Sequence, residues 1–266
     1  MGSLLPARVP IVPPEPTAAV IGSRTLVVIA TYNERENIGP LVTMVREYAP
    51  GSAVLVIDDN SPDGTGAEVR RMALGDGRVK LLERPRKLGL GTAYLAGFRE
   101  AIAGGFDRVL TMDADFSHHP RHLPEILGRA VNPGVDVVIG SRYVAGGGVA
   151  GWPLYRRILS FGANTFARLV LRLQPHDCTG AYRCYSRRVV EALEQGSVVS
   201  NGYSSLLELV WRCQQAGFVI AEVPITFADR EFGESKVSRS EIFRGVTTVL
   251  RLRLRPPRTS PRRDPD

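Results

Sequence analysis

The chain has 266 residues, of which 44% are hydrophobic and 23% are charged, and its formal net charge is +7. This length and composition predict one large globular domain or two small ones, and exclude a largely disordered chain. No apolar run approaches the roughly 18 residues that a membrane-spanning helix needs. Three cysteines without a CxxC pair argue against a disulfide framework or a zinc site, and favour a reducing, cytoplasmic setting.

The predicted elements alternate between strands and helices. Residues 1–23 are rich in proline and are expected to form a flexible leader. Short β-branched runs predict strands at 25–30, 53–57, 79–82, 108–112, 135–139 and 218–223, and 3.6-residue periodicity predicts helices at 38–45, 92–103, 154–173 and 203–216. Alternation at these lengths predicts crossover connections and therefore an α/β fold with a mostly parallel sheet.

Acidic residues directly follow two of the predicted strands. Asp58-Asp59 follow the second strand, and Asp113-Ala114-Asp115 follow the fourth. Ligands of parallel sheets bind outside the carboxyl ends of the strands. Two carboxylates and a diphosphate can share a divalent cation there. The alternative for each acidic pair is a helix cap or a solvated turn, and the turn-forming residues that follow Asp59 favour it for the first pair.

The first predicted strand ends in Thr31-Tyr32-Asn33-Glu34. Tyr32 can stack on a nucleotide base, and Glu34 can accept hydrogen bonds from a base or a sugar. Glu34 can equally cap the helix that follows.

Six short motifs, in order along the chain, carry a resemblance to a known enzyme family. The motifs are Ala30-Thr31-Tyr32-Asn33-Glu34-Arg35-Glu36-Asn37, Asp58-Asp59-Asn60-Ser61-Pro62-Asp63-Gly64-Thr65, Arg86-Lys87-Leu88-Gly89-Leu90-Gly91, Met112-Asp113-Ala114-Asp115-Phe116-Ser117-His118-His119-Pro120, Gly140-Ser141-Arg142-Tyr143 and Phe232-Gly233-Glu234-Ser235-Lys236. With them the chain resembles the inverting GT-A glycosyltransferases of family 2, and most of all the dolichol-phosphate and polyprenol-phosphate mannose synthases. The likeness covers about residues 24–240.

The resemblance implies a fold, a reaction and a cofactor. The fold would be a GT-A-like α/β domain with a mostly parallel sheet and a helical carboxyl-terminal portion. The reaction would transfer mannose from GDP-mannose to a polyprenyl (dolichyl-type) monophosphate in a single displacement, giving a β-mannosyl phosphate lipid. The cofactor would be Mg²⁺ or Mn²⁺.

The resemblance also implies site residues. For the nucleotide sugar it implies Ala30, Tyr32, Glu34, Ile57, Asp59, Asp113, Ala114, Asp115, Arg142, Arg230 and Lys236. It implies Asp113, Asp115 and Arg142 as catalytic residues, Arg142, Arg156 and Ser160 for the acceptor phosphate, and Asp113, Asp115 and Ser117 for the metal. Ala30 and Ser117 depart from the family pattern, in which proline and glutamine are common at these positions.

A lipid phosphate acceptor removes the need for a general base. Its second pKa is about 6 by analogy with phosphoserine, so it is mostly ionised at neutral pH. It needs positive charge beside it, because it repels the donor diphosphate, and arginine binds phosphate through a planar fork of donors. For Arg156 and Arg157 the alternative is an ordinary surface position on a helix. His118 and His119 are expected to shape the turn before Pro120, or to lie near the outer shell of the metal, rather than to act in catalysis.

The carboxyl-terminal residues carry most of the excess positive charge. From Arg239 to Asp266 there are eight arginines and three acidic residues, a net charge of +5. Segment 238–255 predicts a basic amphipathic helix that contacts an anionic membrane surface; the alternative is a helix packed on the catalytic domain of residues 24–237. Segment 256–266 is expected to be a disordered basic tail. The protein would then be peripheral at the cytoplasmic face of the membrane, with a separate membrane-anchoring protein as an open question.

Three alternatives are weighed against this interpretation. A family 2 transferase could use UDP-glucose or another sugar nucleotide with polyprenyl phosphate. A basic nucleic-acid-binding protein would explain the sequence pI of about 9.7, but the charge lies in a tail and no aromatic-and-basic strand pattern accompanies it, so no nucleic-acid partner is expected. A scaffold that has lost turnover is disfavoured by the intact carboxylates.

Overall fold

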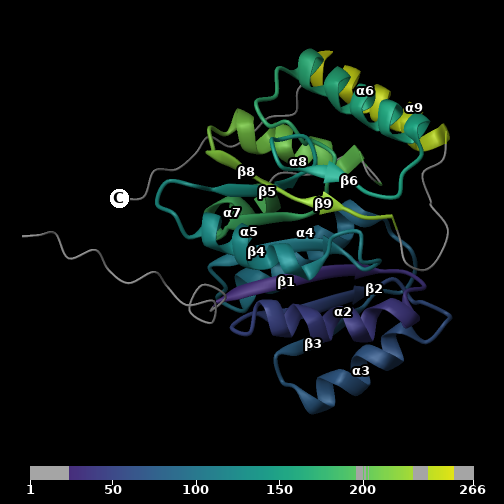
Figure 1. Ribbon diagram of the computed structural model, residues 1–266. Helices are drawn as coiled ribbons and strands as arrows, with labels where there is room; N and C mark the ends of the chain where they lie inside the picture. Colours follow the sequence, from purple (N-terminus) through teal and green to yellow (C-terminus); the bar gives the residue numbers. More distant parts are fainter. Residues whose placement is uncertain (1–23, 196–199, 201, 203, 230–238, 255–266) are drawn as a thin grey trace, which may run out of the picture.

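A mixed sheet flanked by helices forms the centre of the molecule in the computed structural model (Figure 1). The structure describes residues 24–195, 200, 202, 204–229 and 239–254. In the last of these ranges, side chains are described only from residue 244 onward. The strands of this sheet are β1 (Thr25–Thr31), β2 (Ala53–Asp58), β3 (Val79–Glu83), β4 (Arg108–Asp113), β5 (Val137–Ser141), β7 (Arg183–Ser186) and β8 (Ile220–Pro224), and a second sheet pairs β6 (Gly148–Val149) with β9 (Thr226–Phe227). The helices are α2 (Arg35–Tyr48), α3 (Thr65–Gly75), α4 (Leu90–Ala103), α5 (Leu123–Ala130), α6 (Leu154–Leu171), α7 (Arg187–Gln195), α8 (Ser204–Gln215) and α9 (Arg239–Leu254), with the 3-10 turn η1 (Pro120–His122) before α5.

The strand order in the central sheet is β3-β2-β1-β4-β7-β5-β8. All neighbouring pairs are parallel except those of β7, which runs antiparallel to both β4 and β5. The expected α/β architecture with a mostly parallel sheet is therefore confirmed. No local pattern predicted β7, the one strand of the central sheet that runs in the opposite direction.

Alternate residues of the strands supply two hydrophobic cores, one on each face of the sheet. Leu26 and Val28 of β1 belong to the core that includes α4, α7 and α8, whereas Val27 and Ile29 belong to the core beneath α2, α3 and α5. Successive side chains of a strand point to opposite faces, so a fully apolar strand such as β1 has to be covered on both sides. This explains why helices are needed on both faces.

The later part of the chain is mainly helical, and α6 and α9 pack side by side at the end of the molecule remote from α3 (Figure 1). Helix α9 lies inside segment 238–255. The division of the chain into leader, catalytic domain, amphipathic helix and tail stays a prediction, because residues 1–23, 230–238 and 255–266 lie outside the described residues. Across the described ranges, no helix is both long enough and apolar enough to cross a bilayer.

The three cysteines are expected to resist alkylation in the native protein. Cys178, Cys184 and Cys213 are free thiols with at most 1% of their surface exposed. Burial raises the pKa of each thiol to about 12, and the thiolate is the reactive form. Mass spectrometry after iodoacetamide treatment in mildly alkaline buffer should show no adduct on the folded protein and three on the denatured protein. Rapid labelling of the folded protein would contradict this burial.

Candidate active site

The carboxyl ends of β2, β1 and β4 lie next to one another in the sheet. The register pairs Ala30 of β1 with Ile57 of β2 on one side and with Asp113 of β4 on the other. Adjacent strands are about 4.8 Å apart, so the residues implied for the nucleotide and the first acidic residue of the Asp113-Ala114-Asp115 motif occupy one edge. A common site requires this adjacency.

Three non-glycine residues adopt left-handed backbone conformations just after these strands. They are Asn33 (φ 59°) after β1, Asn60 (φ 58°) after β2 and Phe116 (φ 62°) after β4. Asparagine tolerates this region, but a bulky residue such as phenylalanine rarely adopts it. Such strain costs on the order of 1–3 kcal/mol and is concentrated at functional sites, so the turn at Phe116 marks this edge as a candidate site independently of the carboxylates.

The turn at Phe116 orders the acidic motif. Asp115 is only 3% exposed, and its Oδ1 accepts hydrogen bonds from the backbone N–H of Ser117 (3.2 Å) and from the Ser117 hydroxyl. The backbone N–H of Asp113 donates to Nδ1 of His118 (3.0 Å). Burial lowers the pKa of His118 to about 4, so at neutral pH its imidazole is uncharged and carries its proton on Nε2. This hydrogen bond ties His118 into the turn, and whether it also lies near a bound metal stays a prediction.

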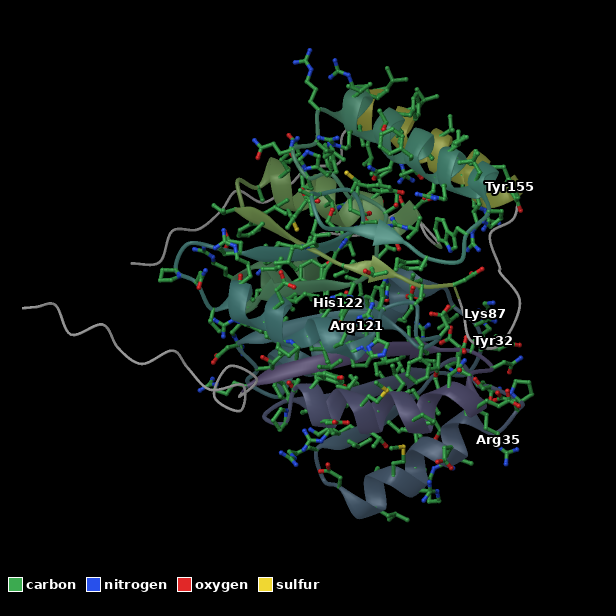
Figure 2. The ribbon with its side chains drawn as sticks, viewed as in Figure 1. Tyr32, Arg35, Lys87, Arg121, His122 and Tyr155 are labelled. Atoms are coloured by element: carbon green, nitrogen blue, oxygen red, sulfur yellow. The ribbon has the colours of Figure 1, made fainter. Side chains whose placement is uncertain are left out.

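The residues implied for the guanosine have partners of their own. Lys87 lies over the Tyr32 ring (4.6 Å to the centroid), and both are seen at one side of the molecule in Figure 2. Glu34 is the N-cap residue of α2, but its carboxylate accepts a hydrogen bond from the side-chain amide of Asn37 (2.8 Å) and makes no capping hydrogen bond to the helix backbone, so the capping alternative weighed for it is not seen. Asp58 accepts from the Thr31 hydroxyl (3.0 Å) and the Ser61 N–H (3.0 Å), the turn-forming role.

Asp59 forms a buried ion pair that sequence reasoning did not identify. Arg84 donates from Nε to Asp59 Oδ1 (2.5 Å), and the Leu88 N–H donates to Oδ2 (3.2 Å). Both side chains of the pair are less than 10% exposed. The Ile57 side chain is fully buried in the core, so only its backbone is placed to contact a nucleotide. The roles of these residues stay predictions.

A cavity of about 260 Å³ brings the catalytic, metal and acceptor residues together. It is lined by Asp113, Asp115, Ser117, Arg142, Arg156 and Ser160, all expected from the sequence, together with apolar side chains of α6, α8 and α9. The lining does not include Ala30, Tyr32, Glu34, Ile57, Asp59 or the buried Ala114. Arg230 and Lys236 lie outside the described residues. The cavity thus joins the carboxylates at the end of β4 to Arg142 after β5, to the Arg156–Asp229 ion pair and to apolar side chains of the later helices.

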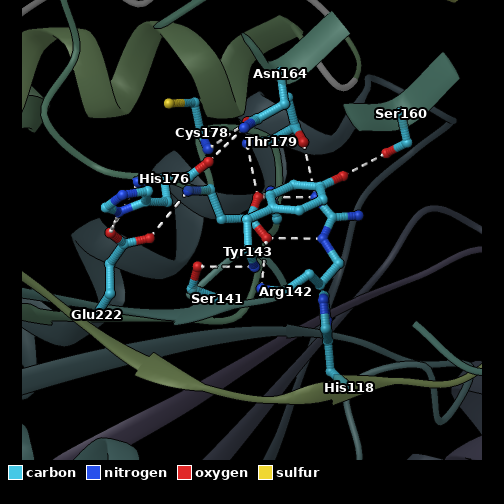
Figure 3. Close-up of polar contacts among 12 residues, drawn as sticks. His118, Ser141, Arg142, Tyr143, Ser160, Asn164, His176, Cys178, Thr179 and Glu222 are labelled. Carbon is cyan, nitrogen blue, oxygen red and sulfur yellow. Dashed lines mark hydrogen bonds and ion pairs between the residues drawn. The ribbon is translucent and has the colours of Figure 1, made fainter. Parts of the chain in front are cut away.

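Arg142 is held by a buried carboxylate that sequence reasoning missed. Its Nε and Nη2 donate to the two oxygens of Asp177 (2.7 and 2.8 Å), and Nη2 also donates to the Thr179 hydroxyl (2.8 Å; Figure 3). Asp177 has no exposed surface. Burial alone would raise the pKa of Asp177, but the charge and hydrogen bonds of Arg142 outweigh it and lower the pKa to about 2. The pair is therefore fully ionised, with Arg142 fixed at the cavity wall.

Asp177 reaches Arg142 because β7 is antiparallel. The start of an antiparallel strand lies at the same edge as the ends of its parallel neighbours. The loop before β7 therefore meets the end of β5, where Arg142 follows. Asp177 also accepts hydrogen bonds from the backbone N–H groups of Arg142 and Gly180 (3.1 and 3.0 Å). In the sequence it is 35 residues from its partner, and no local pattern connects them.

The two acceptor residues implied on α6 both face the cavity. Arg156 donates to Asp229 (3.0 Å) and lies over the Trp152 ring, 4.1 Å from its centroid. The Ser160 and Tyr143 hydroxyls are 2.8 Å apart (Figure 3). Arg156 is therefore not an ordinary surface arginine, because a carboxylate and an aromatic ring hold its guanidinium at the cavity.

The oxygen donors at the acidic end suit a hard divalent cation. Asp113, Asp115 and Ser117 offer only oxygen atoms, which Mg²⁺ and similar ions prefer. Among the described residues, no three His, Cys, Asp or Glu side chains gather into a metal-binding group. A protein-only cage such as a structural zinc site is not built here, whereas a cation shared with a bound diphosphate needs few protein ligands.

Two known proteins are similar to most of this chain. The chain is 47% identical over 233 residues to a polyprenol monophosphomannose synthase of Mycolicibacterium smegmatis (87% of this chain and 88% of that protein). It is 42% identical over 228 residues to an undecaprenyl-phosphate mannosyltransferase of Micrococcus luteus (86% and 93%).

Solved structures of glucosyl-3-phosphoglycerate synthase from Mycobacterium tuberculosis share the fold. The complex with phosphoglyceric acid aligns with a TM-score of 0.63 at 18% identity (89% of this chain and 84% of that one). The complex with Mn²⁺, UDP and glucosyl-3-phosphoglycerate aligns with a TM-score of 0.61 at 18% identity (90% and 85%). The expected GT-A fold is thereby confirmed. The profile of the family described as glycosyl transferase family 2 matches residues 26–194, and the chain belongs to that family.

Proposed function

We propose that this protein transfers mannose from GDP-mannose to the phosphate of a polyprenyl (dolichyl-type) monophosphate, inverting the anomeric centre. One observation carries the proposal: a single cavity joins the carboxylates at the end of β4 to arginines and to an apolar wall. A sugar nucleotide needs the first end, and an acceptor that is both anionic and apolar needs the second. The choice of mannose as the sugar rests on the names of the two relatives, a polyprenol monophosphomannose synthase and an undecaprenyl-phosphate mannosyltransferase.

The donor nucleotide is assigned to the ends of β1 and β2. Tyr32 would stack on guanine, while Glu34, Asp59 and the backbones of Ala30 and Ile57 would surround the nucleoside. The register of the sheet supports this, because it sets Ala30 beside Asp113. Arg230 and Lys236 are assigned to the donor diphosphate on the resemblance alone.

Asp113, Asp115 and Ser117 would hold the divalent cation, Mg²⁺ or Mn²⁺. The fold neighbours supply analogy only: complexes of glucosyl-3-phosphoglycerate synthase contain Mn²⁺ or Mg²⁺ with UDP. When bound, such a cation neutralises the charge that develops on a departing nucleoside diphosphate. The hydrogen bonds from Ser117 hold Asp115 in one orientation before the substrate arrives.

The chain's own residues would steer an acceptor that needs no proton removed. Arg142 and Arg156, with the Ser160 hydroxyl, would hold the ionised phosphate beside the sugar and offset its repulsion by the donor diphosphate. One phosphate oxygen then forms the bond to the anomeric carbon as the bond to GDP breaks. His118 is a poor candidate for a base, because burial lowers its pKa to about 4 and its Nδ1 already accepts from Asp113.

The setting proposed for the reaction is the cytoplasmic face of a membrane, where the protein would be peripheral. A lipid acceptor requires contact with the bilayer, and three buried free thiols suit a reducing compartment.

The donor assignment predicts that GDP stabilises the protein more than UDP does. A ligand present at a hundredfold excess over its Kd adds about 2.7 kcal/mol to the free energy of unfolding, which is a shift of several degrees in Tm. Thermal denaturation with Mg²⁺ and either nucleotide measures this directly. Equal shifts, or a larger shift with UDP, would favour the UDP-glucose alternative.

Transfer itself is tested by incubating the purified protein with radiolabelled GDP-mannose, Mg²⁺ and vesicles that contain polyprenyl phosphate. Label is expected in the organic extract and not in the extract of vesicles that lack polyprenyl phosphate. Label that stays in the aqueous phase under all conditions would refute the proposed acceptor.

A further inference from the structure

Helix α6 carries three polar side chains at four-residue spacing. They are Arg156, Ser160 and Asn164, and residues four apart in a helix lie on the same face of it. The first two line the cavity and are assigned to the acceptor phosphate, whereas Asn164 is not part of the cavity lining. Asn164 is only 1% exposed, although asparagine is mostly exposed in proteins. Its buried amide therefore has a partner inside the protein that the helix needs.

The Asn164 amide bonds to the backbone on either side of Asp177. Its Nδ2 donates to the carbonyl oxygen of His176, and its Oδ1 accepts a hydrogen bond from the Cys178 N–H (2.9 Å; Figure 3). The residue between these two is the carboxylate that holds Arg142. Asn164 is thus a direct link between α6 and the loop that fixes Arg142.

Segment 176–178 is anchored on the central sheet independently of α6. Glu222 of β8 accepts hydrogen bonds from the backbone N–H groups of His176 (2.8 Å) and Asp177 (3.0 Å). The Asp177 carboxylate is bonded to Arg142 as well. A segment held from this many sides keeps its place when one further partner is removed. The bonds to Asn164 therefore place α6 on the segment, and not the segment on α6.

Helix α6 has few buried anchors of its own. Of its 18 residues it buries Asn164, Ala167 and Leu171. Asn164 is the first of the three along the helix, and it is the one with a polar side chain. It lies one turn from Ser160 and about 12 Å along the axis from Arg156. Asn164 is therefore the buried contact nearest to the part of α6 that faces the acceptor.

A second contact supports the same placement of α6. The hydroxyls of Ser160 and Tyr143 are 2.8 Å apart (Figure 3), and Tyr143 directly follows Arg142 in the chain. This contact is only partly buried, whereas Asn164 is fully buried. Both contacts join α6 to Arg142, the first through its chain neighbour and the second through its carboxylate partner.

We propose that Asn164 is a positioning residue, which holds α6 where Arg156 and Ser160 meet the same phosphate group as Arg142. The identity of that phosphate, a prenyl monophosphate, rests on the proposed function. Side chains from two distant parts of the chain have to converge on one small anion, and a misplacement of about 1 Å is costly in such a site. Asn164 acts through the residues that α6 carries, because it does not reach the cavity itself.

Binding of geranyl phosphate in the absence of donor tests this placement by titration calorimetry. Asn164→Ala removes both hydrogen bonds and is expected to weaken binding by about tenfold, because Arg156 and Ser160 lose their alignment. Binding of GDP with Mg²⁺ should be unchanged, since the residues assigned to the nucleotide lie on other elements. Unchanged affinity of this variant for geranyl phosphate would overturn the inference.

Gln214→Ala is the matched control. Gln214 of α8 is an amide that bridges the backbone of the same loop, accepting from the Gln174 N–H (2.7 Å) and donating to the Arg172 carbonyl (2.9 Å). It makes the same kind of contact as Asn164 but is not on α6, so its loss should leave the affinity for geranyl phosphate at the wild-type level. Equal losses in the two variants would show that any weakening of the loop suffices, and would overturn the inference.

Asn164→Ser guards against a variant that fails to fold. Asn164→Ala leaves a buried carbonyl and a buried N–H without partners, which lowers stability. Serine leaves space for a water molecule, for which the hydroxyl and the two backbone groups are suitable partners. Circular dichroism should show the wild-type fold, and geranyl phosphate should bind about threefold more weakly, because α6 is then held through a water. A folded Asn164→Ser variant with wild-type affinity would contradict the positioning role.

Coupling between Asn164 and Arg156 separates positioning from a general loss of stability. Residues this far apart normally have additive effects. If Asn164 places Arg156, then Arg156→Ala should weaken binding of geranyl phosphate much less in the Asn164→Ala background than in the wild-type protein. Additive losses in this double-mutant cycle would mean that Asn164 serves the fold alone.

Steady-state transfer separates this inference from the proposed function. Asn164→Ala should raise the KM for polyprenyl phosphate by about tenfold and leave the KM for GDP-mannose unchanged, whereas a smaller fraction of folded protein would lower kcat and change neither KM. A lower kcat with both KM values unchanged would overturn the positioning role. Wild-type protein that binds geranyl phosphate but transfers no mannose would refute the proposed function, and the binding comparison would still decide the role of Asn164. Wild-type protein that does not bind geranyl phosphate would overturn both.

Discussion

Replacing Asp115 with asparagine is expected to lower mannose transfer by about a thousandfold or more, with the fold unchanged. The cation that Asp115 would hold contributes several kcal/mol to stabilising the leaving diphosphate, and each 1.4 kcal/mol is about a factor of ten in rate. Asparagine has the same shape and can still accept the hydrogen bonds from Ser117. The loss should therefore appear in the rate of transfer and not in Tm.

The control variant is Asp107→Asn, which changes a carboxylate at the opposite end of β4 from Asp115. Asp107 precedes β4 and pairs with Arg24 on the surface (2.8 Å), so its loss should change neither activity nor Tm by much. Steady-state transfer is measured with and without EDTA. Asp115→Asn activity near the wild-type level, unaffected by EDTA, would remove the carboxylate from the metal site.

Replacing Asp177 with asparagine is expected to reduce the free energy of unfolding by about 3–5 kcal/mol and to abolish transfer. The change leaves the buried Arg142 guanidinium without its carboxylate, and removing one partner of a buried ion pair has this cost. The folded-state pKa of about 2 for Asp177 lies below its ordinary value of 3.8. The pair therefore stabilises the fold fully at neutral pH, and this contribution is lost only as pH falls from 3.8 through 2.

Urea denaturation measures the loss, and a double variant separates stability from function. Arg142→Met together with Asp177→Asn removes the stranded charge and leaves an amide oxygen for the N–H of Gly180. This double variant should regain part of the lost stability and stay inactive, since Arg142 would hold the acceptor phosphate. Recovery of activity along with stability would mean that Asp177 and Arg142 serve the fold alone.

The strands with strong apolar runs could be predicted from the sequence. The predicted ranges for β1 to β4 match the structure to within a residue at either end, because each is a β-branched or apolar run closed by polar turn residues. β7 could not be predicted in this way. It has four residues, one of them Arg183, which is charged yet fully buried by hydrogen bonds to the backbone oxygens of Leu206 and Cys178. Tertiary contacts determine that these residues form a strand, and the sequence has no local periodicity that would predict it.

The carboxylates of the candidate site could be predicted from the sequence. The residues that hold the site in place through buried ion pairs could not. Asp113 and Asp115 follow a strand directly, so the rule for parallel sheets was enough to place them. Asp177 and Arg84 each form a buried ion pair with a residue that lies far away in the sequence, at 35 and 25 residues respectively. Such pairings depend on strand order and direction, which a single sequence does not encode in any local pattern.

The proposed donor and acceptor residues lie largely in different lengths of the polypeptide. In the proposed assignment, residues up to Ser117 would build most of the nucleotide and cation side, together with Arg230 and Lys236. The chain after β5 would supply Arg142, its partner Asp177 and the helices of the acceptor side. The two lengths are joined in the central sheet where β4 meets β7. Chimeras exchanged at that junction offer a way to re-target such an enzyme to a new acceptor while it keeps the same activated sugar.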